Sequence, residues 1–234
     1  MTTAAALAWD KLPGLAFEIA LGADGSAWCL GVGEMPSGGG YSIHRWNGAD
    51  WDHIDGAAVK IAAGPDGHPW VVNRDHQILW SAGKDWSVLP GLAREIAVGA
   101  NGAAWCLSSS IMSSGDSTIH VWNGHDWDHV EGAAVKIAVG PDGLPWLTNS
   151  AGNIFRRQGE GWELMPGLAR EIAIGADGSV WCLSSSIMPS GDSTIHVWNG
   201  HDWDQVPGAG VRIAAGAPAA VWLANANHVI FRTA

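Results

Sequence analysis

The segment WSVLPGLAREIAVGANGAAW, residues 86–105, decides the fold because WELMPGLAREIAIGADGSVW, a near copy, follows at residues 162–181. Each runs from one tryptophan through a Pro-Gly pair and a short apolar run to a second tryptophan. Weaker copies begin at four further tryptophans, Trp9, Trp51, Trp127 and Trp203. Long and short copies alternate along the chain, so a unit of about 76 residues occurs three times.

The copies predict strands and no helices. Each contains an Ala-rich run ending in glycine, such as EIAVG at residues 95–99, and in most copies an Asp-Gly or Asn-Gly pair then favours a tight turn. A tryptophan-bearing run, a loop, a third apolar run and a second turn follow. No segment keeps a 3.6-residue period. Six copies of four strands predict an all-β fold, a six-bladed β-propeller with pseudo-threefold symmetry from three tandem two-blade units.

The order of strands within a blade follows from side-chain size. Only small residues fit where blades converge, so the Ala- and Gly-rich runs are expected at the axis and the tryptophan-led runs at the outside. The last copy then lacks its outer strand, and residues 8–13 carry an outer-strand sequence. We expect this N-terminal strand to complete the last blade and close the ring. Residues 1–234 are expected to form one β-propeller domain.

Composition excludes several classes of partner. Asp and Glu number 23 against 12 Lys and Arg, a net charge of −11, which argues against nucleic acid and anionic membrane surfaces. No stretch of about 18 apolar residues occurs, so the sequence does not predict membrane insertion. The first residues show no basic and then apolar segment typical of a secretory signal, so a cytoplasmic location is expected.

The cysteines, the histidines and the recurrent tryptophans are interpreted as structural residues. Cys29, Cys106 and Cys182 occupy one repeated position in separate blades, too far apart for disulfides, and are expected to be free and buried. The ten histidines show no HxH or HxxxH spacing, so we expect neither a metal site nor a cofactor. The tryptophans that recur in all six copies are expected to pack between blades.

The candidate binding residues belong to the long copies. Their second and third strands are joined by GVGEMPSGGGYS, SSSIMSSGDS and SSSIMPSGDS, which should lie on one face together with the PGLAFE and PGLARE segments. Phe17 stands where the other two copies have arginine, so the first site should differ. The candidates on this face are Glu18, Met35, Arg94, Glu95, Met112, Asp116, Arg170, Glu171, Met188 and Asp192.

A second set of candidates lies on the third strand of each long copy. A histidine and a tryptophan stand two residues apart there, and two residues apart on a strand means one face. The three pairs are His44 with Trp46, His120 with Trp122, and His196 with Trp198.

The repeated W-x-x-(V/L)-P-G-x-A-x-x-I-A-x-G-x-x-G-x-x-W segment, followed by runs such as IFRR at residues 154–157, resembles the tectonin repeat over essentially the whole chain. The resemblance implies a six-bladed propeller lectin that binds cell-surface glycans multivalently, among them O-methylated sugars such as mannose or fucose, with a defence role in fungal members. The alternation of long and short copies departs from the family pattern, so ligand positions are not carried over from it.

The residue types suit a lectin. An aromatic ring can cover the apolar face of a pyranose, and planar polar side chains can meet its hydroxyls. A methyl ether adds an apolar methyl group, which Met and Trp side chains would accommodate. Two alternatives remain open: a scaffold propeller that binds protein, and a sialidase-like glycosidase, for which the chain offers one tyrosine, Tyr41, and few basic residues. We expect no enzyme activity. Homo-oligomer formation stays open.

Overall fold

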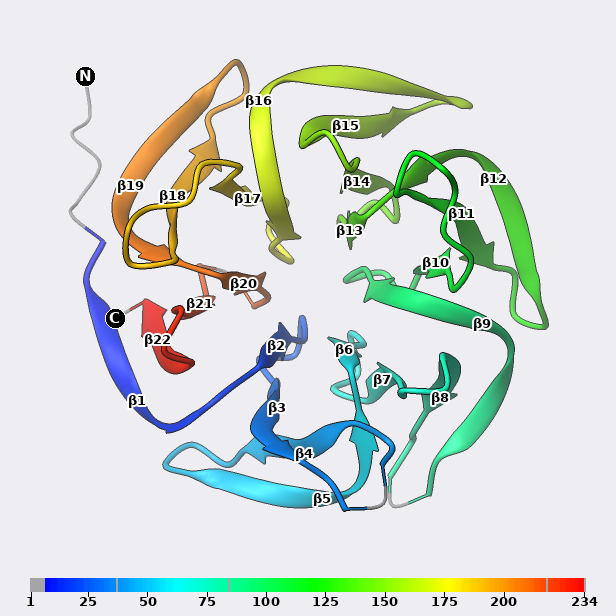
Figure 1. Cartoon of the computed structure of the whole chain (residues 1–234), viewed down its shortest axis with the longest axis vertical. Coiled ribbons are helices and arrows are strands. Elements are labelled where there is room, and N and C mark those ends of the chain that lie inside the picture. The colour runs from blue at the N-terminus through cyan, green and yellow to red at the C-terminus, as the bar shows by residue number, and fades with distance from the viewer. Residues whose placement is uncertain (1–6, 37, 84, 218, 234) are drawn as a thin grey trace.

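The computed structural model describes residues 7–36, 38–83, 85–217 and 219–233, and within them it contains 22 β-strands and no helix. No described element could therefore cross a membrane as a helix. The strands form antiparallel sheets that stand around a central axis in a propeller-like arrangement (Figure 1). The all-β prediction is confirmed.

Two sheets contain four strands each. We call the first unit 1; it consists of β2 (Glu18–Leu21), β3 (Ala27–Glu34), β4 (Tyr41–Trp46) and β5 (Trp51–Ala58). We call the second unit 6; it consists of β20 (Arg212–Ala215), β21 (Val221–Ala224), β22 (Val229–Thr233) and β1 (Trp9–Leu15). In unit 6, β1 pairs antiparallel with β22, Trp9 opposite Thr233. The start and the end of the described chain thus share one sheet.

The remaining strands form two seven-stranded sheets. One holds β6 (Lys60–Ala63), β7 (Pro69–Val72), β8 (Gln77–Trp80), β9 (Ser87–Val98), β10 (Ala104–Ser108), β11 (Ser117–Trp122) and β12 (Trp127–Ala134). The other holds β13 (Lys136–Val139), β14 (Pro145–Thr148), β15 (Asn153–Gln158), β16 (Gly161–Ile174), β17 (Val180–Ser184), β18 (Ser193–Trp198) and β19 (Trp203–Gly210).

Each seven-stranded sheet divides into two units because one long strand serves both. The first half of β9 pairs with β8 and its second half with β10, and β16 does the same between β15 and β17. We call the four resulting units 2, 3, 4 and 5 in chain order. The two PGLARE segments were expected to connect separate strands. That expectation is wrong, because each lies within one continuous strand, with its glycine in a left-handed conformation.

The outer tryptophans fasten each unit to the one before it. Every indole Nε1 donates a hydrogen bond to a backbone carbonyl on the outer strand of the preceding unit, which satisfies the polar end of a ring that otherwise packs on apolar neighbours. The six bonds are Trp51 to Pro13 (2.9 Å), Trp86 to Asp55 (2.7 Å), Trp127 to Pro90 (3.0 Å), Trp162 to Glu131 (2.7 Å), Trp203 to Pro166 (2.8 Å) and Trp9 to Pro207 (2.8 Å). The predicted framework role of these side chains is confirmed.

The core lies between adjacent units. Leu30 and Ile43 of unit 1, for example, share one apolar cluster with Ile61 and Val71 of unit 2. The three cysteines are free and buried, as expected, and burial raises the pKa of each thiol to about 12. Such thiols carry almost no thiolate at neutral pH, which makes them poor nucleophiles.

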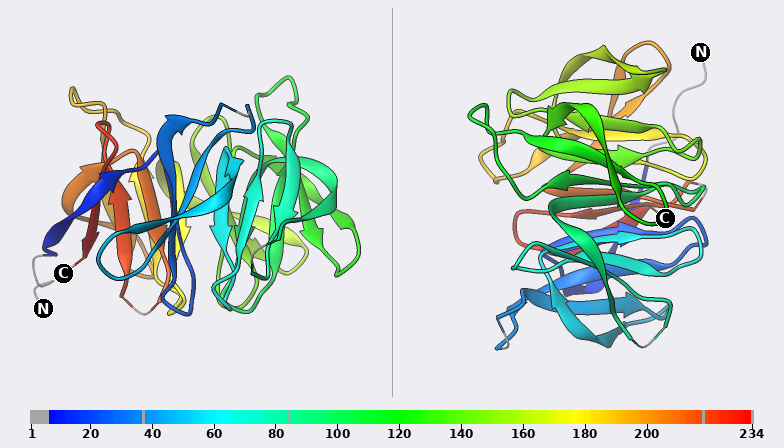
Figure 2. Two further views of the ribbon diagram at one scale, coloured as in Figure 1. Left: turned by 90° about the horizontal axis from the view of Figure 1, so that it is seen from below. Right: turned by 90° about the vertical axis from the view of Figure 1, so that its right-hand side faces the viewer.

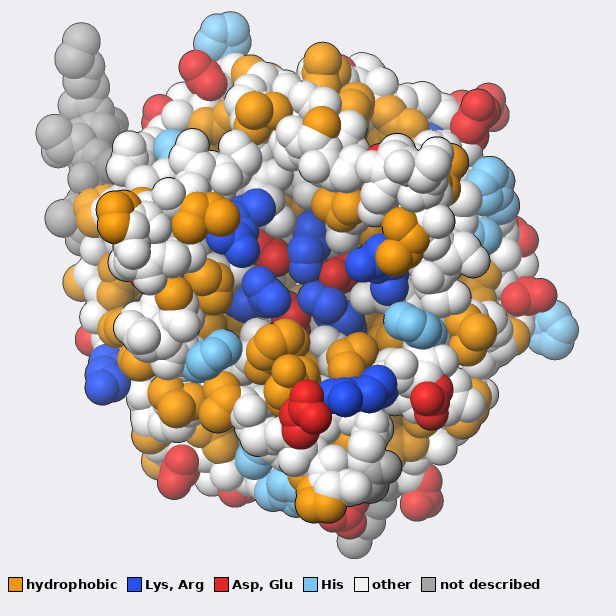
Figure 3. All heavy atoms as spheres, viewed as in Figure 1, with side chains coloured by type: hydrophobic (Ala, Val, Ile, Leu, Met, Phe, Trp, Pro, Cys, Tyr) orange, Lys and Arg blue, Asp and Glu red, His pale blue; other side chains and the backbone are white. Residues whose placement is uncertain are grey.

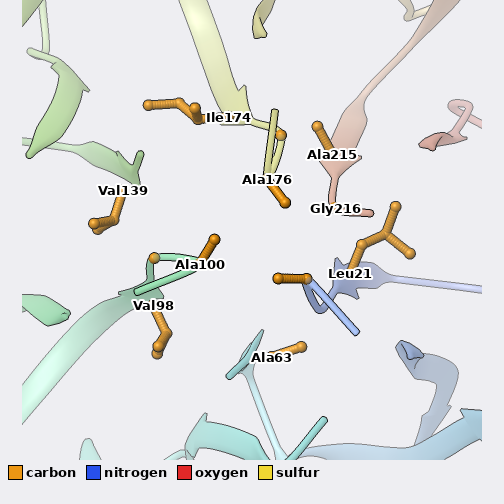
Figure 4. Close-up of a pocket in the computed structure, with 12 residues that line it drawn as sticks. Leu21, Ala63, Val98, Ala100, Val139, Ile174, Ala176, Ala215 and Gly216 are labelled. Atoms are coloured by element: carbon orange, nitrogen blue, oxygen red, sulfur yellow. The ribbon is translucent and has the colours of Figure 1, made fainter. Parts of the chain in front are cut away.

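The innermost strands line the central channel. At the end opposite the long loops the channel is lined by small and branched apolar side chains, among them Ala63, Val98, Val139 and Ala215 (Figure 4). This end encloses only about 20 Å³. The expectation that the Ala- and Gly-rich runs lie at the axis is confirmed.

Candidate functional site

Units 1, 3 and 5, which we call the long units, carry their long β3–β4, β10–β11 and β17–β18 loops on one face of the molecule (Figure 2). We call this the loop face. At the loop tips Ile111 and Ile187 are 60% and 64% exposed, beside the exposed Met112 and Met188. The corresponding Met35 in unit 1 is only partly exposed. Two of the three loops therefore present an apolar tip to solvent.

Two aspartates fix these loops to the next unit. Asp116 and Asp192 are buried, and their carboxylates accept hydrogen bonds from the backbone N–H groups of Ser150 (2.7 Å) and Ala226 (2.6 Å). Unit 1 has Gly40 at this place and is tied instead by an ion pair between Arg74 and Glu34 (2.8 Å). The two candidate aspartates thus hold the loops in place.

A cavity of about 230 Å³ lies between units 2 and 3, which we call the peripheral cavity. His120, Trp127 and Ser108 border it from unit 3, and Gly91 and Leu92 border it from β9. It combines an indole ring with polar atoms in a space below the size of typical drug-binding pockets.

The histidine of the peripheral cavity is held in place by hydroxyl groups. The Nε2 atom of His120 lies 3.0 Å from Thr118 Oγ1, which donates in turn to Ser108 Oγ at 2.9 Å. Burial, and then the proximity of His129, lowers the pKa of His120 below its ordinary value. The imidazole is therefore neutral at pH 7, with one nitrogen as donor and the other as acceptor.

The same arrangement recurs in unit 5 and in altered form in unit 1. In unit 5, His196, Thr194 and Ser184 repeat the chain with distances of 2.9 and 3.0 Å. In unit 1, His44 Nε2 lies 2.9 Å from Ser42 Oγ, but Gly31 replaces the outer serine. A Cβ atom on Gly31 would come within 2.7 Å of Ser42 Oγ, so the change suits the closer packing there.

The tryptophan of each predicted pair packs against the preceding unit. The ring centroid of Trp122 lies 5.1 Å from Trp127 and 6.4 Å from Trp70 of unit 2. Trp46 and Trp198 sit in matching clusters, with Trp222 of unit 6 and Trp146 of unit 4. Since His120 borders a cavity shared with unit 2, the pair lies on one face of its strand, as predicted. The tryptophans also help to join the units.

The three candidate glutamates lie at the channel, in a ring of ion pairs that we call the axial ring. Acid and base alternate around it, and each charge contacts both of its neighbours. The pairs are Glu18–Lys60 (2.9 Å), Lys60–Glu95 (3.0 Å), Glu95–Lys136 (3.0 Å), Lys136–Glu171 (3.0 Å), Glu171–Arg212 (3.4 Å) and Arg212–Glu18 (3.2 Å).

Electrostatics favour the charged forms of four groups in the axial ring: Glu18, Glu95, Lys136 and Arg212. Burial by itself raises the pKa of Glu18, but Lys60 and Arg212 outweigh it and lower that pKa to about 2. For Lys136, burial lowers the pKa, and Glu171 and Glu95 together raise it above its ordinary value. The glutamate carboxylates are thus already paired with cations.

Sequence reasoning missed the basic half of this ring. Its signal was available, because one repeated position of the six innermost segments alternates between Glu and Lys or Arg: Glu18, Lys60, Glu95, Lys136, Glu171 and Arg212. Apart from the methionines and aspartates of the long loops, the candidate residues therefore separate into two places. Glutamates and arginines lie near the axis, and histidines and tryptophans lie between units.

Among the described residues, no group of three or more His, Cys, Asp or Glu could hold a metal ion. Unit 1 differs from units 3 and 5 near the axis. Phe17 stacks on Tyr41 with ring centroids 4.2 Å apart, and Arg212 lies 5.6 Å above the Phe17 ring. Unit 1 thus carries an aromatic stack near the axis.

Comparison with known proteins gives a family and a fold. The tectonin domain family matches residues 60–234, and a sequence search of curated proteins finds no match. A gluconolactonase from Xanthomonas campestris is similar in structure, with 11% identity and a TM-score of 0.66 over 95% of this chain and 87% of that one. YCF48 bound to D1 peptide has 14% identity and a TM-score of 0.59, covering 99% and 97%.

The SapL1 lectin in complex with alpha methyl fucoside is also similar, with 15% identity and a TM-score of 0.58 over 95% of this chain and 92% of that one. At these identities the likeness to solved structures shows a shared fold. The family match spans most of the chain and agrees with the repeats on which the fold is built. The chain belongs to the tectonin family.

Proposed function

We propose that the protein is a lectin with one glycan-binding site on each long unit. The observation that carries the proposal is the peripheral cavity, where the Trp127 ring faces the same space as His120 and Ser108. An indole can cover the C–H face of a pyranose, while an oriented imidazole and a hydroxyl exchange hydrogen bonds with its hydroxyl groups. Membership of the tectonin family supports the assignment.

The candidate residues take different parts in the proposed sites. The histidines His44, His120 and His196 contact sugar, and the tryptophans Trp46, Trp122 and Trp198 support the aromatic wall behind them. Loop residues Met35, Met112 and Met188 flank the sites from the loop face. The acids Glu18, Glu95, Glu171, Asp116 and Asp192 act indirectly, because ion pairs or backbone N–H groups engage their carboxylates.

We further propose that units 1–6 are the six blades of one closed propeller domain spanning residues 1–234. Pairing of β1 with β22, and the bonds that link Trp9 to unit 5 and Trp51 to unit 6, support closure. Sites held on one rigid ring raise avidity for a glycan-coated surface by about 10²–10⁴ over a single contact when the spacing matches.

O-methylated glycans, and a role in defence, are the finer part of the proposal. The tectonin resemblance supports both, and the apolar tips at Ile111 and Ile187 add a surface suited to methyl ethers. We propose no catalysis. The only tyrosine, Tyr41, is stacked on Phe17, which leaves it poorly placed to act as a sialidase-type nucleophile.

A glycan array that includes O-methylated sugars tests this function. We expect binding, reduced at least tenfold in His120→Ala/His196→Ala. The matched control is His125→Ala/His201→Ala, because these two histidines lie exposed in turns of the same units. Absence of binding to every glycan would refute the lectin assignment, and a protein partner captured in the presence of competing sugar would favour the scaffold alternative.

A further inference from the structure

The loop face carries a second cavity, nearer the axis than the peripheral one. This axial cavity has a volume of about 450 Å³ and lies where units 2, 3 and 4 meet. Its apolar lining includes Val59 and Ile111. Its polar lining includes Arg94, His76 and Ser109, together with three members of the axial ring, Lys60, Glu95 and Lys136. The backbone bond from Ser109 N–H to the Leu92 carbonyl (3.0 Å) lies between it and the peripheral cavity.

The charges beside this cavity do not cancel. The axial ring is neutral, with three acids and three bases paired around it. Arg94 and Arg170 stand next to the ring, each adjacent in sequence to one of its glutamates, and both are half-buried. In the described part of the chain neither guanidinium has an ion-pair or hydrogen-bond partner.

These two arginines are therefore surplus cations on a protein whose net charge is −11. The loop face shows Lys and Arg side chains gathered around its centre (Figure 3). A half-buried guanidinium keeps five N–H donors in a fixed fork that matches a carboxylate, sulfate or phosphate group. An anion is the ligand that would satisfy it.

The backbone at the rim is also unusual. His76 adopts a left-handed conformation with φ of 64°, as His228 does at the equivalent position of unit 6 (63°), whereas the equivalent residue in unit 4 is Gly152 with φ of 82°. Ala93 N–H bonds to the His76 carbonyl, as Ala169 N–H bonds to that of Gly152, which shows the equivalence. A histidine in this conformation places an imidazole at the cavity beside Arg94, at an energetic cost that glycine avoids.

We propose that the axial cavity binds the anionic substituent of an acidic saccharide, through Arg94 in unit 3 and through Arg170 at the equivalent place in unit 5. The inference rests on the proposed lectin function and names the ligand class for this second kind of site. The apolar side chains of Val59 and Ile111 contact the ring of the sugar, and Ser109 contacts its hydroxyls. Unit 1 does not take part, because the Phe17–Tyr41 stack occupies the corresponding space.

Isothermal titration at low ionic strength tests the proposal with glucuronate and galacturonate against glucose and galactose. We expect the uronates to bind at least tenfold more tightly than their neutral parents, with two equivalents per chain. Arg94→Gln and Arg170→Gln should each remove one equivalent, and the double variant should remove both. Arg94→Lys/Arg170→Lys should keep weakened binding, because lysine retains the charge without the fork.

The matched control is Lys11→Gln/Arg45→Gln, which removes two exposed cations far from the cavity and should leave uronate binding unchanged. Sulfated and phosphorylated sugars, with inorganic sulfate as a separate arm, identify the anionic group. Uronates no tighter than neutral sugars would overturn the inference while leaving the lectin function intact. Inorganic sulfate bound as tightly as every acidic sugar, in a protein that binds no neutral glycan, would overturn both. Thermal melts confirm that each variant folds.

Discussion

Units 1 and 3 share strand order, loop position and a place on the axial ring, yet they differ beside the axis. Unit 3 leaves Arg94 unpaired next to a cavity, and unit 1 fills the corresponding place with Phe17 stacked on Tyr41. Both units contribute a glutamate that two cations contact. The comparison shows that a repeat can keep its structural charges while one site is closed by two aromatic substitutions.

The largest expected effect concerns what the two units share. Lys136→Ala leaves Glu95 and Glu171 each without one of its cations at a mostly buried position, and removing one partner of a buried ion pair costs about 3–5 kcal/mol. Urea unfolding should show this loss, with Lys136→Arg much closer to wild type. A loss below 1 kcal/mol for the alanine variant would mean that the ring contributes little to stability.

The second prediction concerns acid. The folded-state pKa values of Glu18 and Glu95 lie below their ordinary values, so the carboxylates stabilise the fold above the unfolded pKa near 4.5. That contribution should be lost as pH falls from about 4.5 towards the folded pKa of Glu18, about 2. Thermal melts between pH 6 and 2 should show a steep fall in Tm across this window. Glu18→Gln should lower the Tm at pH 6 and flatten the fall; an unchanged profile in that variant would contradict the assignment.

The smallest effect on stability should come from converting unit 1 to the open type. Phe17→Arg/Tyr41→Ser removes an aromatic stack worth about 0.5–1.5 kcal/mol beyond its buried area and places a guanidinium where units 3 and 5 have one. Titration with glucuronate should then show three equivalents in place of two. The single variant Tyr41→Ser, which adds no cation, should retain two equivalents. Two equivalents in the folded double variant would show that the arginine alone does not make the site.

Much of the fold could be predicted because six copies of the repeat carry the same pattern of strands and turns. The glycine-terminated runs are innermost and line the axis, and every outer tryptophan bonds to the preceding unit. The continuity of β9 and β16 could not be predicted, since a Pro-Gly pair is a turn signal and each strand is continuous only because it pairs with one neighbour before the pair and another after it.

The candidate site was predictable in part. Alternation placed His120 and Trp122 on one face, and Phe17 marked the first long unit as different. The roles of Asp116 and Glu95 were hidden, because their partners Ser150 and Lys136 lie 34 and 41 residues further along the chain. A carboxylate has the same signature in the sequence whether it binds a ligand or accepts a hydrogen bond from a neighbouring backbone.

The pairing of β1 with β22 has a mechanical consequence. The two strands run antiparallel, with Trp9 and Thr233 at one end of the ladder and Leu15 and Val229 at the other. Tension applied to both termini would therefore peel this ladder open one rung after another, starting at Trp9, instead of shearing all of its rungs at once. Force along the chain would detach β1 first and leave the other sheets folded.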